Sequence, residues 1–128
     1  MALSAGKEPT ILVVEDEAAI RLMIADALRA EGFGVVEASS GDEALTVIEG
    51  GTRVNLVFTD VRMPGTLDGL ALVGRLRVTR PDLKLAVGSG YVPEWPAPNL
   101  VDLFIGKPYN VPRTVKRLKD LLTSKAPQ

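Results

Sequence analysis

Short apolar segments alternate with amphipathic segments along almost the whole chain, and this alternation limits the possible folds more than any other feature. The apolar segments are too short for helices and cover residues 10–14, 34–38, 56–59, 84–87 and 103–105. Between them, apolar residues recur at helical spacing over residues 17–31, 40–49, 70–80 and 110–122. The pattern predicts a doubly wound α/β fold, in which a five-stranded parallel sheet carries helices on both faces.

A proline-rich segment interrupts this alternation before the fifth strand. Residues 91–102 stand where a fourth helix is due, but Pro93, Pro96 and Pro98 fall close together there. Proline removes a backbone donor and clashes with the preceding turn, so a helix interior does not accept it. We therefore expect the fourth helix to be short or irregular.

The composition excludes several classes of protein. The 128 residues include no cysteine and no histidine, and the formal net charge is −1. A cysteine nucleophile, a Ser-His-Asp triad and a Cys/His zinc site are therefore ruled out. The near-zero charge argues against nucleic-acid binding, and no apolar run approaches the roughly 20 residues of a membrane span. We expect a cytoplasmic protein with one domain over residues 1–128, a core at about 10–123, and loose ends at 1–8 and 124–128.

Polar residues follow four of the predicted strands. Glu15 and Asp16 follow the first strand, Asp60 the third, Ser89 the fourth and Lys107 the fifth. The carboxyl ends of parallel strands meet at one edge of the sheet, where folds of this class bind ligands. Crowded carboxylates repel one another unless a cation compensates them, and Mg²⁺ prefers oxygen ligands. The set predicts a phosphoryl-transfer site in which a carboxylate can itself be the nucleophile.

Each of these residues also has an ordinary structural interpretation. Acidic residues before a helix often serve as caps, and an aspartate at a strand end often forms a turn. A serine before a glycine is commonly a loop residue, and a lysine before a proline is commonly a solvated edge residue. Their joint position at four strand ends of one predicted sheet favours a common site.

Four short motifs, taken in this order and spacing, resemble the receiver domain of bacterial two-component response regulators. They are Val13-Val14-Glu15-Asp16-Glu17, Phe58-Thr59-Asp60-Val61-Arg62-Met63-Pro64-Gly65, Ser89-Gly90-Tyr91 and Gly106-Lys107-Pro108-Tyr109. The resemblance, and not the residue pattern, supplies a flavodoxin-like strand order of 2-1-3-4-5. The Ser89-Gly90-Tyr91 motif and the proline-rich segment after it resemble a stand-alone, single-domain type with a degenerate fourth helix.

The resemblance implies a role for each acidic residue at the sheet edge. Asp60 corresponds to the phosphoacceptor. Glu15 and Asp16 correspond to the acidic pair that holds Mg²⁺ together with Asp60, and the backbone carbonyl of Arg62 would be a further ligand. We expect that Mn²⁺ can substitute for Mg²⁺.

The resemblance also implies a switch. Ser89 corresponds to the hydroxyl that turns toward the phosphoryl group, and Lys107 to the lysine that pairs with it. Phe104 falls where the family keeps an aromatic side chain that moves inward on activation. The Lys107–Pro108 bond is expected to be cis, against the usual preference. An added phosphoryl group brings close to two negative charges, which would favour one of two loop arrangements.

The function implied by the resemblance is that of a phosphoacceptor in a two-component phosphorelay. A sensor histidine kinase or a histidine phosphotransfer protein would supply the phosphoryl group, and a downstream protein would be a further partner. We expect no catalysis beyond the chain's own phosphorylation and dephosphorylation. Because the chain ends a few residues after the last predicted helix, we also expect a receiver that stands alone.

Two alternatives come from other classes of protein. A small Mg²⁺-dependent phosphatase with an aspartyl nucleophile would use the same sheet edge, but such enzymes carry a second aspartate where this chain has Arg62. A nucleotide-binding α/β module would need a glycine-rich phosphate loop after the first strand, where this chain has Glu15 and Asp16. Both therefore fit less well than the receiver.

Overall fold

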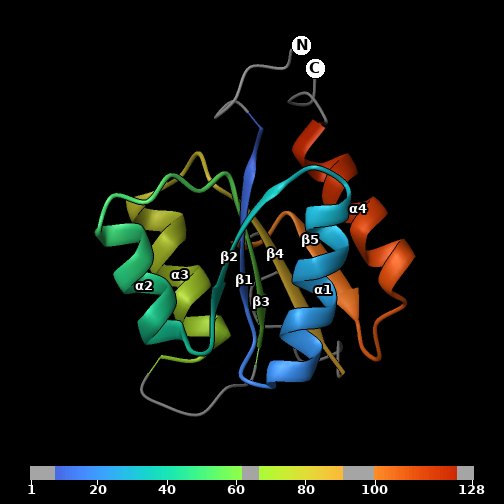
Figure 1. Cartoon of the computed structure of the whole chain (residues 1–128). Coiled ribbons are helices and arrows are strands. Elements are labelled where there is room, and N and C mark those ends of the chain that lie inside the picture. The colour runs from blue at the N-terminus through green and yellow to red at the C-terminus, as the bar shows by residue number, and fades with distance from the viewer. Residues whose placement is uncertain (1–7, 62–66, 91–99, 124–128) are drawn as a thin grey trace.

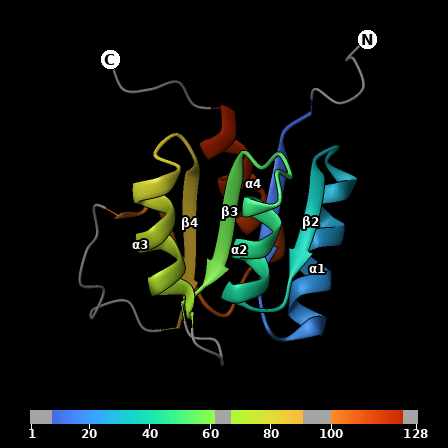
Figure 2. The same ribbon diagram turned by 90° about the vertical axis from the view of Figure 1, so that its left-hand side faces the viewer.

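The computed structural model describes residues 8–61, 67–90 and 100–123, and these form a parallel sheet between two layers of helices. The strands lie in the order β2-β1-β3-β4-β5. Figure 1 views the sheet from its edge, with α2 and α3 on one face and α1 and α4 on the other; in Figure 2 the helices α2 and α3 lie in front of the sheet. The elements are β1 (Thr10–Val14), α1 (Ala18–Ala30), β2 (Gly34–Ala38), α2 (Gly41–Glu49), β3 (Leu56–Asp60), α3 (Gly69–Thr79), β4 (Lys84–Ser89), β5 (Leu103–Gly106) and α4 (Val111–Thr123). The predicted α/β fold and strand order are confirmed.

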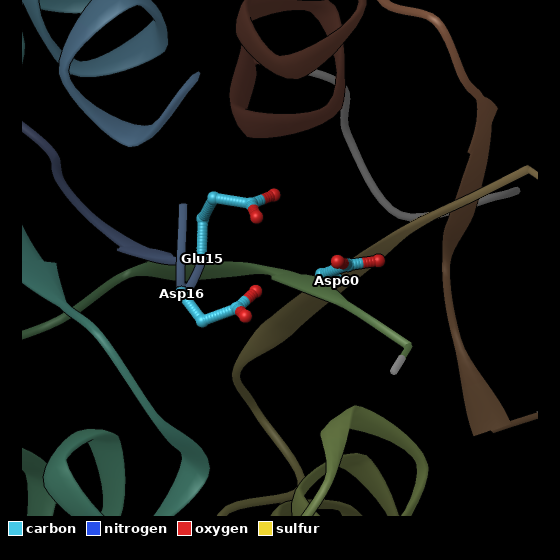
Figure 3. Close-up of side chains that lie close together, drawn as sticks. All are labelled: Glu15, Asp16 and Asp60. Atoms are coloured by element: carbon cyan, nitrogen blue, oxygen red, sulfur yellow. The ribbon is translucent and has the colours of Figure 1, made fainter. Parts of the chain in front are cut away.

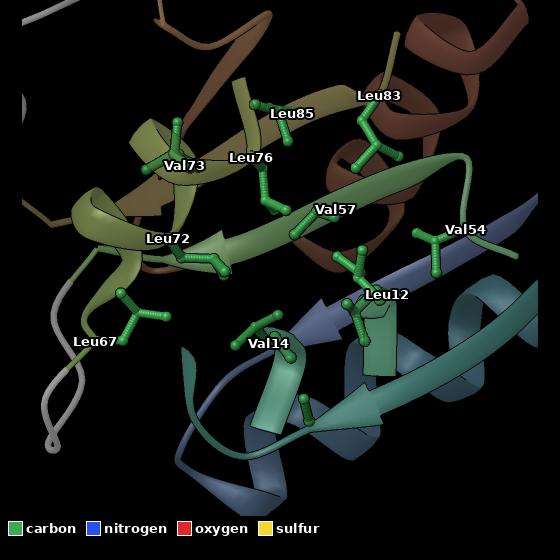
Figure 4. Packing of buried hydrophobic residues seen from close by; sticks show 14 residues of the cluster. Leu12, Val14, Val54, Val57, Leu67, Leu72, Val73, Leu76, Leu83 and Leu85 are labelled. Atoms are coloured by element: carbon green, nitrogen blue, oxygen red, sulfur yellow. The ribbon is translucent and has the colours of Figure 1, made fainter. Parts of the chain in front are cut away.

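Side chains that alternate along each strand build two separate cores. Leu12 and Val57 belong to the cluster beneath α2 and α3 (Figure 4). Their neighbours Ile11 and Phe58 belong to the cluster beneath α1 and α4. Burial on both faces is the reason that the strands are continuously apolar rather than alternating with polar residues.

The ends of α1 and α2 differ slightly from the predicted ranges and are capped by neighbouring residues. Glu17 and Glu31 flank α1 instead of lying in it, and Gly32 follows with a φ of +96°, a conformation that favours glycine. At α2, the Ser40 hydroxyl accepts a hydrogen bond from the Glu43 backbone N–H at 3.0 Å. The Glu43 carboxylate reaches back to the N–H and hydroxyl of Ser39, one residue earlier than the usual reciprocal bond.

Three strands extend further toward the functional edge than the sequence predicts. The third, fourth and fifth strands end at Asp60, Ser89 and Gly106 rather than one or two residues before them. In the ladder, Asp60 pairs with Gly88, and Ser89 pairs with Gly106. Asp60 and Ser89 are therefore held by the sheet itself and not by loops.

Several expectations fall outside the described residues. These are the carbonyl of Arg62, most of the proline-rich segment at 91–102, and almost all of the ends at 1–8 and 124–128. Within the described part of the chain no α-helix lies between β4 and β5, so the last helix carries the label α4. Over the same ranges, no helix has the length and apolar character needed to cross a membrane.

Candidate functional site

Three carboxylates converge where β1 and β3 end. Glu15 and Asp16 follow β1 and Asp60 ends β3, and one carboxylate oxygen from each lies within 4.8 Å of the others. In Figure 3 the side chains of Glu15 and Asp16 extend from neighbouring backbone positions toward the side on which Asp60 lies. Glu15 is 4% exposed and Asp60 9%, whereas Asp16 is exposed. The predicted acidic cluster is therefore present, with one solvent-facing member.

The chemistry of this donor set fits a hard divalent cation. Burial raises the pKa of the Glu15 carboxyl above its ordinary value of 4.5, and the charge of Asp60 raises it further. A hydrogen bond from the Glu17 backbone N–H to Glu15 Oε2, at 3.2 Å, and the charge of Lys107 act in the opposite direction. The site thus concentrates negative charge in a partly buried place. A cation held by oxygen ligands would offset the repulsion among these carboxylates.

Lys107 lies between the two buried acids. Its Nζ is 3.0 Å from Asp60 Oδ2 and 3.5 Å from Glu15 Oε1. Burial alone would lower the pKa of this ammonium, but the hydrogen bond and charge of Asp60, with the charge of Glu15, raise it above 10.5. Lys107 is therefore a fixed positive charge at the site.

The β4 and β5 strands place the remaining predicted residues. Ser89 is 8% exposed and ends β4, and its backbone carbonyl accepts a hydrogen bond from the Lys107 N–H at 2.9 Å. Phe104 pairs with Val87 in the ladder and packs, partly buried, against the core beneath α2 and α3. The Lys107–Pro108 bond is cis, as the resemblance implies.

The sequence did not single out Tyr109, which closes the site from the α1 and α4 side. Its ring packs on Phe58, with 5.5 Å between ring centroids, and lies 5.6 Å from Lys107 Nζ. Burial, with the charges of Asp60 and Glu15, raises the pKa of its phenol, so it stays neutral. The hydroxyl occupies the space over Gly88. A glycine within an apolar strand is a signal for such a close approach.

A second close approach lies beneath the phosphoacceptor candidate. A Cβ built on Gly69 would lie 1.8 Å from the Asp60 carbonyl oxygen. The Gly69 N–H donates to the Val61 carbonyl at 2.9 Å, and Asp68 caps α3 by accepting from the Ala71 N–H at 2.9 Å. The start of α3 is thereby fixed against the end of β3.

The chain is similar to known proteins over most of its length. A family model described as the response regulator receiver domain matches residues 11–119. The chain belongs to this family. Among solved structures, a receiver domain protein from Methanospirillum hungatei JF-1 has a TM-score of 0.83 at 28% identity, covering 91% of this chain and 94% of that one. The response regulator TrrA of Thermotoga maritima, solved in complex with Mg²⁺ and BeF, has a TM-score of 0.80 at 30% identity and covers 88% and 98%.

The matched part makes up very different shares of the curated relatives of this receiver domain. The sensor kinase CckA of Brucella abortus (strain 2308) is 41% identical over 118 residues, which are 88% of this chain and 12% of that protein. The chain spans 64% and 50% of the next two relatives. In CckA and in the last of these relatives, the match therefore concerns only part of a longer protein.

Membership of the family confirms the predicted class of function. Receiver domains are phosphoacceptors of two-component systems and bind Mg²⁺ at an acidic pocket. The phosphatase alternative is not favoured by these matches. The roles of the individual residues remain predictions.

Proposed function

We propose that Asp60 is the phosphoacceptor and that a histidine kinase or a histidine phosphotransfer protein is its phosphoryl donor. The observation that carries this assignment is the position of Asp60. Both Asp60 and Glu15 are buried, but of the three acids only Asp60 ends a central strand, and its contact with Lys107, at 3.0 Å, is the shorter one. A nucleophile held by the sheet and paired with a fixed cation is positioned before the donor arrives.

The transfer is a displacement at phosphorus. An Asp60 carboxylate oxygen forms a bond to phosphorus while the N–P bond of the donor phosphohistidine breaks, and the imidazole leaves with the electron pair. Glu15, Asp16, Asp60 and the Arg62 carbonyl would hold Mg²⁺, which when bound supplies charge neutralisation at the phosphoryl oxygens. We propose that Mn²⁺ can replace it. Lys107 moves its ammonium from the carboxylate to a phosphoryl oxygen.

The response to phosphorylation passes through β4 and β5. The Ser89 hydroxyl turns toward the phosphoryl group, and Phe104 moves inward on the same side of the sheet. The bond from the Lys107 N–H to the Ser89 carbonyl joins the two strands at this point and supports a coupled change. The changed surface around β4, β5 and α4 would be read by a downstream protein.

An apolar cavity of about 500 Å³ beside Lys107 supports access for the donor. Ile20 and Met23 of α1 line it together with Pro108 and Tyr109. Met23 is 48% exposed, so a partner would bury it on docking. We also propose that the protein is cytoplasmic and catalyses only its own phosphorylation and dephosphorylation.

The test is phosphorylation by a small donor. The protein is incubated with Mg²⁺ and acetyl phosphate and its intact mass is measured. We expect one base-labile phosphoryl adduct, which Asp60→Asn abolishes and the control Asp26→Asn on the outer surface of α1 retains. An adduct that survives Asp60→Asn in a folded protein would move the acceptor elsewhere. Turnover of p-nitrophenyl phosphate would instead support the phosphatase.

A further inference from the structure

Arg21, on the first turns of α1, joins the acidic site to a salt bridge on the other side of β1. Its Nη1 donates to the Glu15 backbone carbonyl at 2.8 Å, and its Nε donates to Glu37 Oε1 at 3.3 Å. Both side chains of this ion pair are largely buried, at 19% and 25% exposure. We propose that Arg21, oriented by Glu37, is a positioning residue that sets the geometry of the Glu15 and Asp16 carboxylates for Mg²⁺. The inference rests on the magnesium role proposed for the acidic cluster.

The contact of Arg21 lies at the peptide bond between Glu15 and Asp16, the two residues whose carboxylates extend into the site. The Glu15 carbonyl belongs to the peptide that links Glu15 to Asp16, so the guanidinium restrains the backbone of both residues. On the other side, the Glu15 N–H donates to the Ala38 carbonyl at 3.0 Å. With both of its backbone polar groups bonded, Glu15 has little freedom to rotate after the end of β1. The side chains therefore start from a fixed backbone.

Glu37 gives the guanidinium one orientation. It lies in β2 opposite Val13, and its second oxygen, Oε2, forms an ion pair with Arg29 Nη2 at 3.0 Å. Glu37 pairs with two arginines of α1 and thereby holds this helix against β2. It also offsets the charge of Arg21, which would otherwise repel a cation bound nearby.

The proposal predicts that replacing Arg21 weakens Mg²⁺ binding, whereas loss of its charge alone would strengthen it. Replacing a cationic side chain beside a cation site should tighten Mg²⁺ binding if charge alone matters. Losing a residue that orients metal ligands should weaken it, and partners of this kind typically contribute tenfold or more to affinity. The sign of the change therefore separates positioning from bulk electrostatics.

The experiment is a calorimetric titration of MgCl₂ into the apo protein at fixed ionic strength, with stability measured in parallel by urea unfolding. Arg21→Gln is expected to raise the Kd for Mg²⁺ about tenfold under conditions in which it is folded. The matched control is Arg29→Gln, which also breaks a Glu37 ion pair but whose other contacts go to Asp26 and the Val35 carbonyl. Its Kd should stay within about twofold of the wild-type value.

The outcomes divide cleanly. A Kd for Arg21→Gln that is unchanged or lower overturns the inference, and so does an equal loss in both variants, which would mean general loosening of α1. If Arg21→Gln does not fold, Arg21→Lys takes its place. Its ammonium lacks the planar set of donors with which the guanidinium orients both partners, so a Kd raised about threefold supports the proposal and a wild-type Kd overturns it. Absence of Mg²⁺ binding by the wild type would overturn the proposed function itself.

Discussion

At the scale of single residues, Lys107 occupies part of the space in which the acids would receive a cation. Its ammonium lies 3.0 Å from Asp60 and 3.5 Å from Glu15. Lys107→Gln should therefore lower the Kd for Mg²⁺ by roughly fivefold, because a competing positive charge is removed. The same calorimetric titration measures it. Weaker binding would mean that the lysine holds the two acids in their binding geometry.

Gly88 and Tyr109 form a matched pair next to the site. A Cβ at position 88 would lie 1.8 Å from the Tyr109 hydroxyl oxygen and 2.7 Å from Cζ. Gly88→Ala should therefore lower the free energy of unfolding by about 2 kcal/mol through overpacking. Combining it with Tyr109→Phe should recover part of this loss, because the closest atom is removed. Urea unfolding measures all three variants.

Gly74 provides the control for that prediction. It lies in α3, and no atom comes within 4 Å of a Cβ built on it. Gly74→Ala should raise the free energy of unfolding by about 0.5–1 kcal/mol, the usual gain from replacing glycine in a helix. If Gly88→Ala and Gly74→Ala shift stability in the same direction, the contact with Tyr109 does not constrain position 88.

At the scale of elements, periodicity predicts the type of every described helix and strand, and its larger errors, of up to two residues, are at strand ends. Asp60, Ser89 and Gly106 resemble turn residues, yet each ends a strand. Ladder bonds to the neighbouring strand hold them there, and those partners are far away in the sequence. A single-sequence pattern carries no information on such pairing.

The acidic cluster could be predicted because all parallel strands end at one edge of the sheet. Arg21 and Tyr109 could not, because they act through contacts between elements. Arg21 binds a backbone carbonyl and an acid on β2. Tyr109 fills a space that exists only once β4 and the loop after β5 are packed. Arg21 lies in none of the four motifs, and Tyr109 ends the fourth motif without a role that its position in the sequence indicates.

Capping of α2 gives a pH-dependent prediction. The bonds from the Ser39 N–H and hydroxyl lower the pKa of Glu43 below its ordinary 4.5. This stabilisation is present above pH 4.5 and is lost as the pH falls through the lower folded pKa. Glu43→Gln should therefore lower the free energy of unfolding by about 0.5 kcal/mol at pH 7, a modest value because Glu43 is exposed.

The loss from Glu43→Gln should disappear in acid, as followed by urea unfolding over pH 3 to 7. Ser40→Ala serves as the comparison, because it removes the other half of the cap without a titratable group. It should cost about 1 kcal/mol at every pH. A Glu43→Gln deficit that stays constant down to pH 3 would show that the carboxylate charge contributes nothing to the cap.

At the scale of the whole molecule, metal binding should stabilise the folded state, because only folding brings the three acids together and a bound cation offsets their repulsion. The cluster links the ends of β1 and β3, and an unfolded chain does not bring its members together. A ligand that binds only the folded state stabilises it by mass action, about 2.7 kcal/mol at a concentration of 100 times Kd. Without divalent ions, the same carboxylates repel one another and lower stability.

Asp16→Asn tests this coupling, because Asp16 is the exposed member of the cluster and its removal leaves the Lys107 ion pairs intact. In EDTA the variant should be more stable than the wild type by about 0.5 kcal/mol, since one like charge is gone. In Mg²⁺ the order should invert, because the wild type gains most of the binding energy. Urea unfolding under both conditions measures the inversion.

Glu17→Gln, which removes an acid beside the same helix end but outside the cluster, should show no inversion. If Asp16→Asn is the less stable protein in EDTA, Asp16 acts mainly through the α1 dipole, as an ordinary acidic residue before a helix does.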